Sequence, residues 1–343
     1  MNKNDFNFIF DNNNLYDKIK HGKGLAFPPL WRERKEGQPF FAQIQLKGGK
    51  HGFNLKKNNA TVDPADVTVP PYYADHPAIR EEIAKHYETI RITDNEVGQI
   101  IAALKEDKLL DNTMVVFWTD HGMVLHRHKQ WLYEGGIRVP MIIAGGAFAI
   151  EPGSTRDDLI SGLDITATTL SLCGISPRKH DWIEGRNFFA QNHQPRDFVI
   201  SARDRCDYTI DRVRSVTTKK YKYLRNFMTD RTFMQPQYRD GRPYIEAERE
   251  LYKQGKLNAV QAFKWGPRVP EELYDLENDP DEINNLANDP KYAEALAEHR
   301  TILEQWIKDT DDKGQYPESI DSLRGVLTRW DKQAVNPEYE KAR

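Results

Sequence analysis

Two short, continuous apolar runs constrain the fold more than any other feature of the chain. Residues 113–118 (Thr-Met-Val-Val-Phe-Trp) and 139–144 (Val-Pro-Met-Ile-Ile-Ala) lack the alternation of a half-buried strand and are typical of parallel strands covered on both faces. Apolar residues recur at helical spacing from Ile83 through Tyr87 and Ile90 to Leu104, and a second helix is expected at about 164–173. This order predicts an α/β sheet flanked by helices, with its site at the carboxyl ends of the strands.

The rest of the chain divides around this sheet. Residues 1–38 are polar and form an irregular lead-in, whereas 40–46 alternate like a strand that stops at a glycine pair, and 198–201 form a further short strand of the same sheet. After residue 212, two runs at 214–218 and 221–224 predict a hairpin, and a charged helix is expected over 290–308. We therefore expect an α/β portion over 39–211 and a smaller α+β C-terminal subdomain over 212–343.

Charge and hydropathy exclude several functions. Lys and Arg number 49 against 52 Asp and Glu among 343 residues, so no positive excess points to nucleic acid or to an anionic membrane. No apolar run approaches the roughly 20 residues that span a bilayer, and the first residues show no apolar signal core, so the localisation stays open. The two cysteines, Cys173 and Cys206, are expected to be buried thiols rather than a disulfide.

The chemistry is expected directly after the first apolar run. Asp120 and His121 precede a glycine, and Lys129 and the run 133–140 (Tyr-Glu-Gly-Gly-Ile-Arg-Val-Pro) follow. A carboxylate beside an imidazole can bind a divalent cation, although an Asp in such a place also caps turns. The whole pattern resembles the second signature of the sulfatase family, of the arylsulfatase type within the alkaline phosphatase superfamily. The resemblance implies that Asp120 and His121 bind Ca²⁺ or another divalent cation and that Lys129 contacts the sulfate as a catalytic residue.

The resemblance extends over most of the chain. Residues 39–41 (Pro-Phe-Phe) are similar to a family strand whose following histidine bonds the leaving oxygen of the substrate. Counting from Pro39 places Lys50 at that position and His51 one place later, so His51 as the catalytic imidazole and Lys50 as a substrate-binding rival both stay open. Residues 63–77 resemble a loop of the heparan N-sulfatase branch. Residues 272–286 resemble the segment that closes bacterial sulfatases, where the role is structural.

Other polar side chains have two interpretations each. His126 and His128 lie on the loop that carries Lys129 and are expected either to reach the substrate or to be solvated. Arg203 follows a strand and either binds an anionic group, as Arg205 also could, or belongs to a surface cluster of ion pairs. Among these residues, His128 and Arg203 are taken as the candidates for substrate binding.

The family also uses a nucleophile that this sequence does not contain. Its formylglycine arises from the Cys or Ser of a C/S-x-P-x-R element, and the Pro after Cys173 stands four places on instead of two. We therefore expect the element, with two further acidic metal ligands, in a missing N-terminal fragment. Relatives with all these elements are usually periplasmic, secreted or lysosomal.

The resemblance implies a sulfuric ester hydrolase that acts on a sulfated glycan or small molecule. This chain alone is expected to have little activity and weak metal affinity, because Ca²⁺ takes roughly 6 to 8 oxygen ligands. Two alternatives stay open. One is a phosphodiesterase or phosphonate hydrolase of the same superfamily, and the other is a non-catalytic protein that retains an anion-binding pocket.

Overall fold

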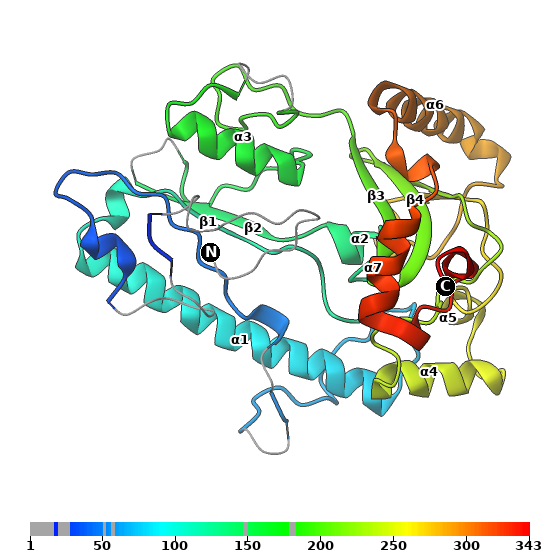
Figure 1. Cartoon of the computed structure of the whole chain (residues 1–343). Coiled ribbons are helices and arrows are strands. Elements are labelled where there is room, and N and C mark those ends of the chain that lie inside the picture. Colours follow the sequence, from blue (N-terminus) through cyan, green and yellow to red (C-terminus); the bar gives the residue numbers. More distant parts are fainter. Residues whose placement is uncertain (1–16, 20–27, 51–52, 56–58, 147–149, 178–182) are drawn as a thin grey trace. The chain divides into compact units, whose positions relative to one another are not determined.

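The computed structural model describes residues 17–19, 28–50, 53–55, 59–146, 150–177 and 183–343 (Figure 1). Its contacts divide the chain into two compact units. The first comprises Met1–Val69, Asp75–Val124 and Pro140–Ser154, and the second comprises Pro70–Ala74, Leu125–Val139 and Thr155–Arg343. The domain limits expected near residues 38 and 211 stay a prediction. Each unit is described by itself below.

A 30-residue helix, α1 (Pro77–Glu106), runs through the first unit. It begins where Pro77 presets the helical backbone and the His76 ring accepts the backbone N–H of Ala78 at 3.2 Å. The helix was expected, but the prediction of its buried face was partly wrong, because Tyr87 and Ile90 are 44% and 48% exposed. The polar residues beside them are buried instead, because the Glu88 carboxylate accepts backbone N–H groups of the preceding loop.

The strands β1 (Val115–Trp118) and β2 (Met141–Ala144) form a two-stranded antiparallel sheet in which Val115 pairs with Ala144. The expectation of parallel strands covered on both faces was therefore wrong. A parallel pair needs a crossover, usually a long helix, and the segment between these strands holds only the four-residue helix α2 (Glu134–Ile137). Trp118 and Ile142 are 46% and 63% exposed.

The expected strand over 40–46 was also wrong, because no strand is assigned there in the described part of the chain. Phe40 and Ile44 instead pack against the cluster of Trp31, Ala103 and Leu104. Three short 3₁₀ helices complete the described part of this unit: η2 (Leu30–Glu33), η3 (Gly48–Lys50) and η4 (Leu110–Asn112).

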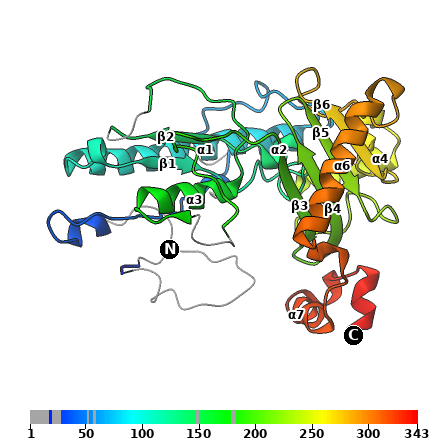
Figure 2. The same cartoon turned by 90° about the horizontal axis from the view of Figure 1, so that it is seen from above.

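The second unit is built on a four-stranded antiparallel sheet in the order β3-β4-β5-β6 (Figure 2). Its strands are β3 (Val199–Cys206), β4 (Thr209–Thr217), β5 (Tyr221–Asn226) and β6 (Glu271–Asp275), so the expected hairpin is confirmed. The strand expected at 198–201 is present as the start of β3, but it belongs to this sheet and not to the sheet of β1 and β2. Cys206 pairs with Thr209 across a two-residue turn in which Asp207 has a φ of 53°, and this turn directs β3 onto β4.

The second unit contains the two further helices that the sequence predicts, α3 (Gly162–Leu172) and α6 (Ala293–Thr310). Helix α6 packs on the sheet where Leu296 and Leu303 meet Val216, Tyr223 and Leu273. The other helices of this unit within the described residues, besides α2, are α4 (Pro243–Lys253), α5 (Ala259–Ala262), α7 (Ile320–Trp330), η6 (Pro290–Tyr292), η7 (Lys313–Gln315), η8 (Asp331–Gln333) and η9 (Pro337–Lys341).

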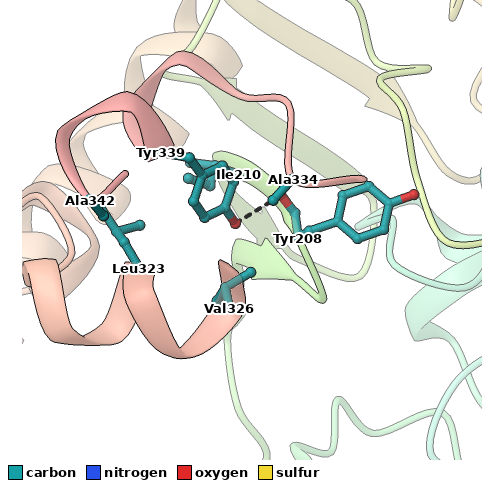
Figure 3. Close-up of a cluster of buried hydrophobic side chains, with 7 residues drawn as sticks. All are labelled: Tyr208, Ile210, Leu323, Val326, Ala334, Tyr339 and Ala342. Carbon is teal, nitrogen blue, oxygen red and sulfur yellow. Dashed lines mark hydrogen bonds between the residues drawn. The ribbon is translucent and has the colours of Figure 1, made fainter. Parts of the chain in front are cut away.

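The C-terminal helices close over the β3–β4 turn (Figure 3). Leu323 and Val326 of α7 pack with Tyr208 of that turn and Ile210 of β4, and the buried Tyr339 hydroxyl donates to the Tyr208 carbonyl at 2.9 Å. The described helices include none that is long and apolar enough to cross a membrane.

Candidate functional site

Asp120 and His121 follow β1 in the first unit, as the sequence predicts. The His121 Nε2 atom lies 3.6 Å from Asp120 Oδ1, and His121 Nδ1 lies 2.7 Å from the Gly122 carbonyl. The Asp120 side chain is 64% exposed. Two donors suit a cation, but the described residues contain no group of three or more His, Cys, Asp or Glu side chains that could hold one. They therefore do not form a complete calcium site, and their roles stay predictions.

Lys129 lies in the second unit, on a tight turn with an unusual backbone. Arg127 and Gln130 have φ values of 66° and 78°, a left-handed conformation that side-chain-bearing residues rarely adopt. The Trp131 N–H donates to the His128 carbonyl at 3.0 Å and closes the turn. The Lys129 ammonium lies 5.5 Å from the centre of the Tyr238 ring, so an aromatic face supports the charge.

The two histidines of this turn are buried. The His126 Nε2 atom lies 2.7 Å from a Glu248 carboxylate oxygen, both side chains are fully buried, and burial lowers the pKa of His126. The interpretation of His126 as a solvated side chain was therefore wrong, whereas its contact with a substrate stays a prediction. The His128 Nε2 atom lies 3.0 Å from the Tyr72 hydroxyl, and His128 as a substrate contact stays a prediction.

The segment 272–286 holds the turn in place. The Arg127 guanidinium lies 3.9 Å from the centre of the Tyr133 ring and donates to the Glu282 carbonyl. The Glu282 carboxylate accepts the Glu134 N–H at 2.7 Å, and the Tyr133 hydroxyl donates to Glu272 at 2.6 Å. The closing segment that the sequence marks as structural therefore fixes both sides of the lysine turn.

Glu282 is the most perturbed carboxylate of this contact. It is 2% exposed, and burial raises its pKa to about 7 although the Lys222 ammonium lies 3.7 Å away. Lys222 is itself buried and pairs with Glu134. Lys222 of β5 thus joins the sheet to Glu134 and Glu282, and the pKa of Glu282 is near neutral.

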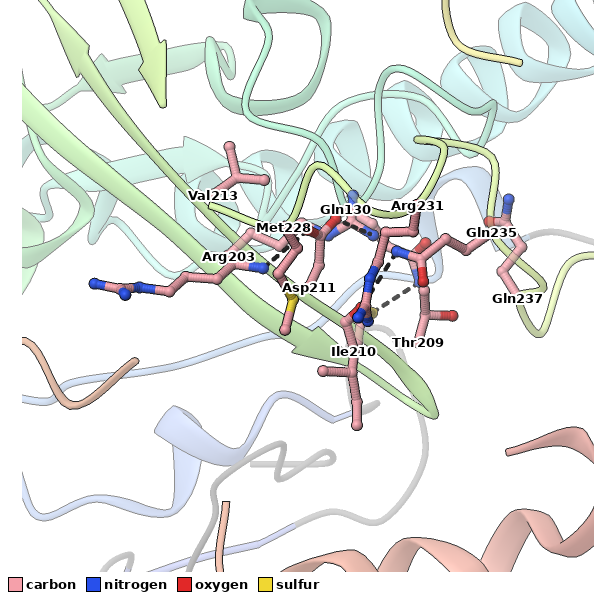
Figure 4. Close-up of polar contacts among 12 residues, drawn as sticks. Gln130, Arg203, Thr209, Ile210, Asp211, Val213, Met228, Arg231, Gln235 and Gln237 are labelled. Carbon is pink, nitrogen blue, oxygen red and sulfur yellow. Dashed lines mark hydrogen bonds and ion pairs between the residues drawn. The ribbon is translucent and has the colours of Figure 1, made fainter. Parts of the chain in front are cut away.

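Arg203 lies on β3, and its side chain points inward rather than onto the surface. It pairs with Asp211 at 3.5 Å and lies 5.5 Å from the centre of the Trp131 ring, while burial lowers its pKa. Gln130 and Arg203 belong to the same group of polar contacts (Figure 4). Arg203 as a substrate contact stays a prediction. The Lys50 side chain and all of His51 lie outside the described residues.

Sequence reasoning missed Arg239, which is 1% exposed and bonds to the turn that carries Lys129. No spacing or motif distinguishes this arginine, because its partners are more than 100 residues earlier in the chain. The neighbouring Tyr238 was missed for the same reason.

A cavity of about 580 Å³ lies elsewhere in the second unit, between the end of α3 and the segment 185–194. Its lining contains none of the residues that the sequence predicts for the site. The loop after α3, which contributes Ser176 and Pro177 to the lining, lacks the family's C/S-x-P-x-R spacing. Cavity size therefore does not identify the candidate site in this chain. Cys173, beside this lining, is exposed and Cys206 is half-buried, and both are free thiols, so the expectation of buried thiols was wrong for Cys173.

Known proteins share both the sequence pattern and the fold. The model of the sulfatase family matches residues 2–175. An ulvan-active sulfatase of Formosa agariphila is 35% identical over 84% of this chain and 55% of its own length. Human N-sulphoglucosamine sulphohydrolase is 28% identical over 73% of this chain and 52% of its own length. Among solved structures, phosphonate monoester hydrolase of Agrobacterium radiobacter matches with a TM-score of 0.56 and 17% identity over 80% of this chain and 57% of its own.

The fold places the chain in the class of proteins that includes a solved 2-O GAG sulfatase and the phosphonate monoester hydrolase. Within that class, the chain belongs to the sulfatase family, whose model covers half of its residues. The chain spans about half the length of the curated relatives it matches. Members of this family generally use formylglycine and a divalent metal ion.

Proposed function

We propose that this chain forms part of a sulfuric ester hydrolase whose substrate is a sulfated carbohydrate. The turn that presents Lys129 carries the proposal. Its backbone is fixed, its ammonium is supported by an aromatic ring, and a positive charge held in place stabilises the charge on a transferring sulfuryl group. The ulvan-active and glucosamine-directed relatives support a sulfated sugar as the substrate class.

Asp120 and His121 would contribute two donors to the divalent-cation site of the complete enzyme. The pair lies at the end of β1 with an exposed carboxylate, which suits a ligand shared with other side chains. Further donors would have to complete this site, since the described residues contain no group of three or more His, Cys, Asp or Glu side chains that could hold a metal ion. For this chain alone we expect a calcium dissociation constant weaker than about 10⁻³ M, measured by calorimetry.

The test of substrate binding compares a sulfated disaccharide with its unsulfated counterpart by NMR titration of the full chain. Lys129→Met should weaken binding of the sulfated sugar by about tenfold or more, the loss expected for a charge-assisted hydrogen bond. Lys308→Met, at an exposed position of α6, is the matched control and should bind like the parent chain. Equal affinity for the two sugars, or equal effects of the two substitutions, would contradict the proposal.

The fold alone also fits a phosphonate hydrolase, since such an enzyme shares it. The Tyr-Glu-Gly-Gly run after Lys129 favours sulfate by its resemblance to the sulfatase signature. A phenyl phosphonate ester that binds more tightly than the sulfated disaccharide, through Lys129, would establish the alternative.

A further inference from the structure

The backbone around Lys129 is held in a conformation that it would not adopt alone. Left-handed φ values at Arg127 and Gln130 strain the backbone and persist only where neighbouring groups fix them. The two residues flank His128 and Lys129. The direction of the Lys129 side chain therefore depends on whatever holds this turn.

Arg239 contacts both ends of the turn. One guanidinium nitrogen, Nη1, donates to the Leu125 carbonyl at 3.2 Å. The other, Nη2, donates to the Lys129 carbonyl at 3.2 Å and to the Gln130 side-chain oxygen at 2.9 Å. A guanidinium is planar and presents five N–H donors in a fixed fork, so its orientation fixes the carbonyls that it binds.

The residues beside Arg239 add to this grip. The Gln237 side-chain oxygen accepts from Arg239 Nε at 3.1 Å and from Nη2 at 2.8 Å, which orients the guanidinium. The Tyr238 ring lies beneath the Lys129 ammonium at 5.5 Å. Gln130 in turn donates to the Cys206 sulfur at 2.7 Å on β3, which ties the turn to the sheet. Tyr238 and Arg239 thus supply an aromatic face and a cation to the turn, and the Gln237 amide orients that cation.

We propose that Arg239, oriented by Gln237, is a positioning residue that holds the Lys129 ammonium in the direction needed to meet a sulfate group. The proposal rests on the proposed function in naming sulfate, whereas the hold on the turn stands on contacts alone. Arg239 acts through the backbone of the turn, and no contact with the substrate is assigned to it.

The first test is amide hydrogen exchange in the peptide that covers residues 124–131, measured by mass spectrometry on the full chain. Arg239→Lys keeps the positive charge but loses the fork, so exchange should accelerate by about fivefold or more, the factor expected from one lost buried hydrogen bond. Arg268→Lys is the matched control. Arg268 is also buried in this unit, but it binds Asp211 and the carbonyls of Met228 and Thr232 rather than the carbonyls of the turn.

Gln130→Ala is a milder second variant that removes one acceptor of Arg239, and it should accelerate exchange by a smaller factor. Unchanged exchange in both Arg239→Lys and Gln130→Ala, or an equal acceleration in Arg268→Lys, would overturn the proposal.

The second test measures the affinity for the sulfated disaccharide in the same variants. Arg239→Lys should weaken binding, because turning the Lys129 ammonium away lowers the fraction of chains that are competent to bind, whereas Arg268→Lys should not. Accelerated exchange with unchanged affinity would overturn the positioning role. If the parent chain binds no sulfated sugar, the proposed function fails, and the exchange result still decides whether Arg239 holds the turn.

Discussion

The buried carboxylate of Glu282 gives a prediction about pH that can be worked out from the structure. Its pKa is raised by burial from 4.5 to about 7. Between these two values the native protein binds a proton that the unfolded chain has released, so stability falls as pH rises through this window. A shift of this size corresponds to about 3 kcal/mol, which is present below about pH 4.5 and lost above about pH 7.

The substitution Glu282→Gln should remove this dependence. The glutamine is neutral at every pH, and its side-chain oxygen can still accept the Glu134 N–H. The assay is urea unfolding at about pH 5 and about pH 7.5. The parent chain should lose about 2 kcal/mol more stability between the two pH values than the variant does, because part of the contribution is already lost at pH 5. Glu277→Gln, an exposed carboxylate of the same segment, is the control and should leave the pH dependence unchanged.

Parallel pH dependences for the parent and Glu282→Gln would refute the reasoning. They would mean that Lys222, 3.7 Å away, keeps Glu282 ionised and that attraction outweighs burial at this site. A steeper loss in the variant would reverse the sign of the effect and exclude burial as its cause.

Two substitutions test the packing of the second unit. Tyr339→Phe removes a hydroxyl that donates to a buried carbonyl, so thermal unfolding should report a loss of about 1 kcal/mol, and an unchanged melting temperature would contradict the contact. Gly136→Ala would place a Cβ 2.3 Å from two backbone carbonyl oxygens and should cost about 1 to 3 kcal/mol. Gly325→Ala, on the open side of α7, should instead stabilise slightly, and equal losses at the two glycines would refute the steric argument.

Parts of the fold could be predicted because they follow from local spacing. Helices α1, α3 and α6 and the β4–β5 hairpin were all expected from patterns within about 30 residues. The buried face of α1 was only partly right. Periodicity marks apolar residues, and Glu88 takes an inner position through hydrogen bonds that no apolar pattern contains.

The candidate site divides in the same way. The Asp-His pair after β1 and the lysine turn were found by resemblance, and the family match confirms the family while leaving the role of each residue to experiment. The contacts made by Glu282 and Arg239 could not be foreseen, because each meets the turn from more than 100 residues away.

The sequence by itself determined the family, the local elements and the position of Lys129 along the chain, since these depend on the order and spacing of residues. The tertiary structure alone decided that β1 and β2 pair antiparallel, that β3 joins the second sheet, and that His126 is buried against Glu248. Strand pairing, burial and side-chain hydrogen bonds depend on partners that only folding brings together.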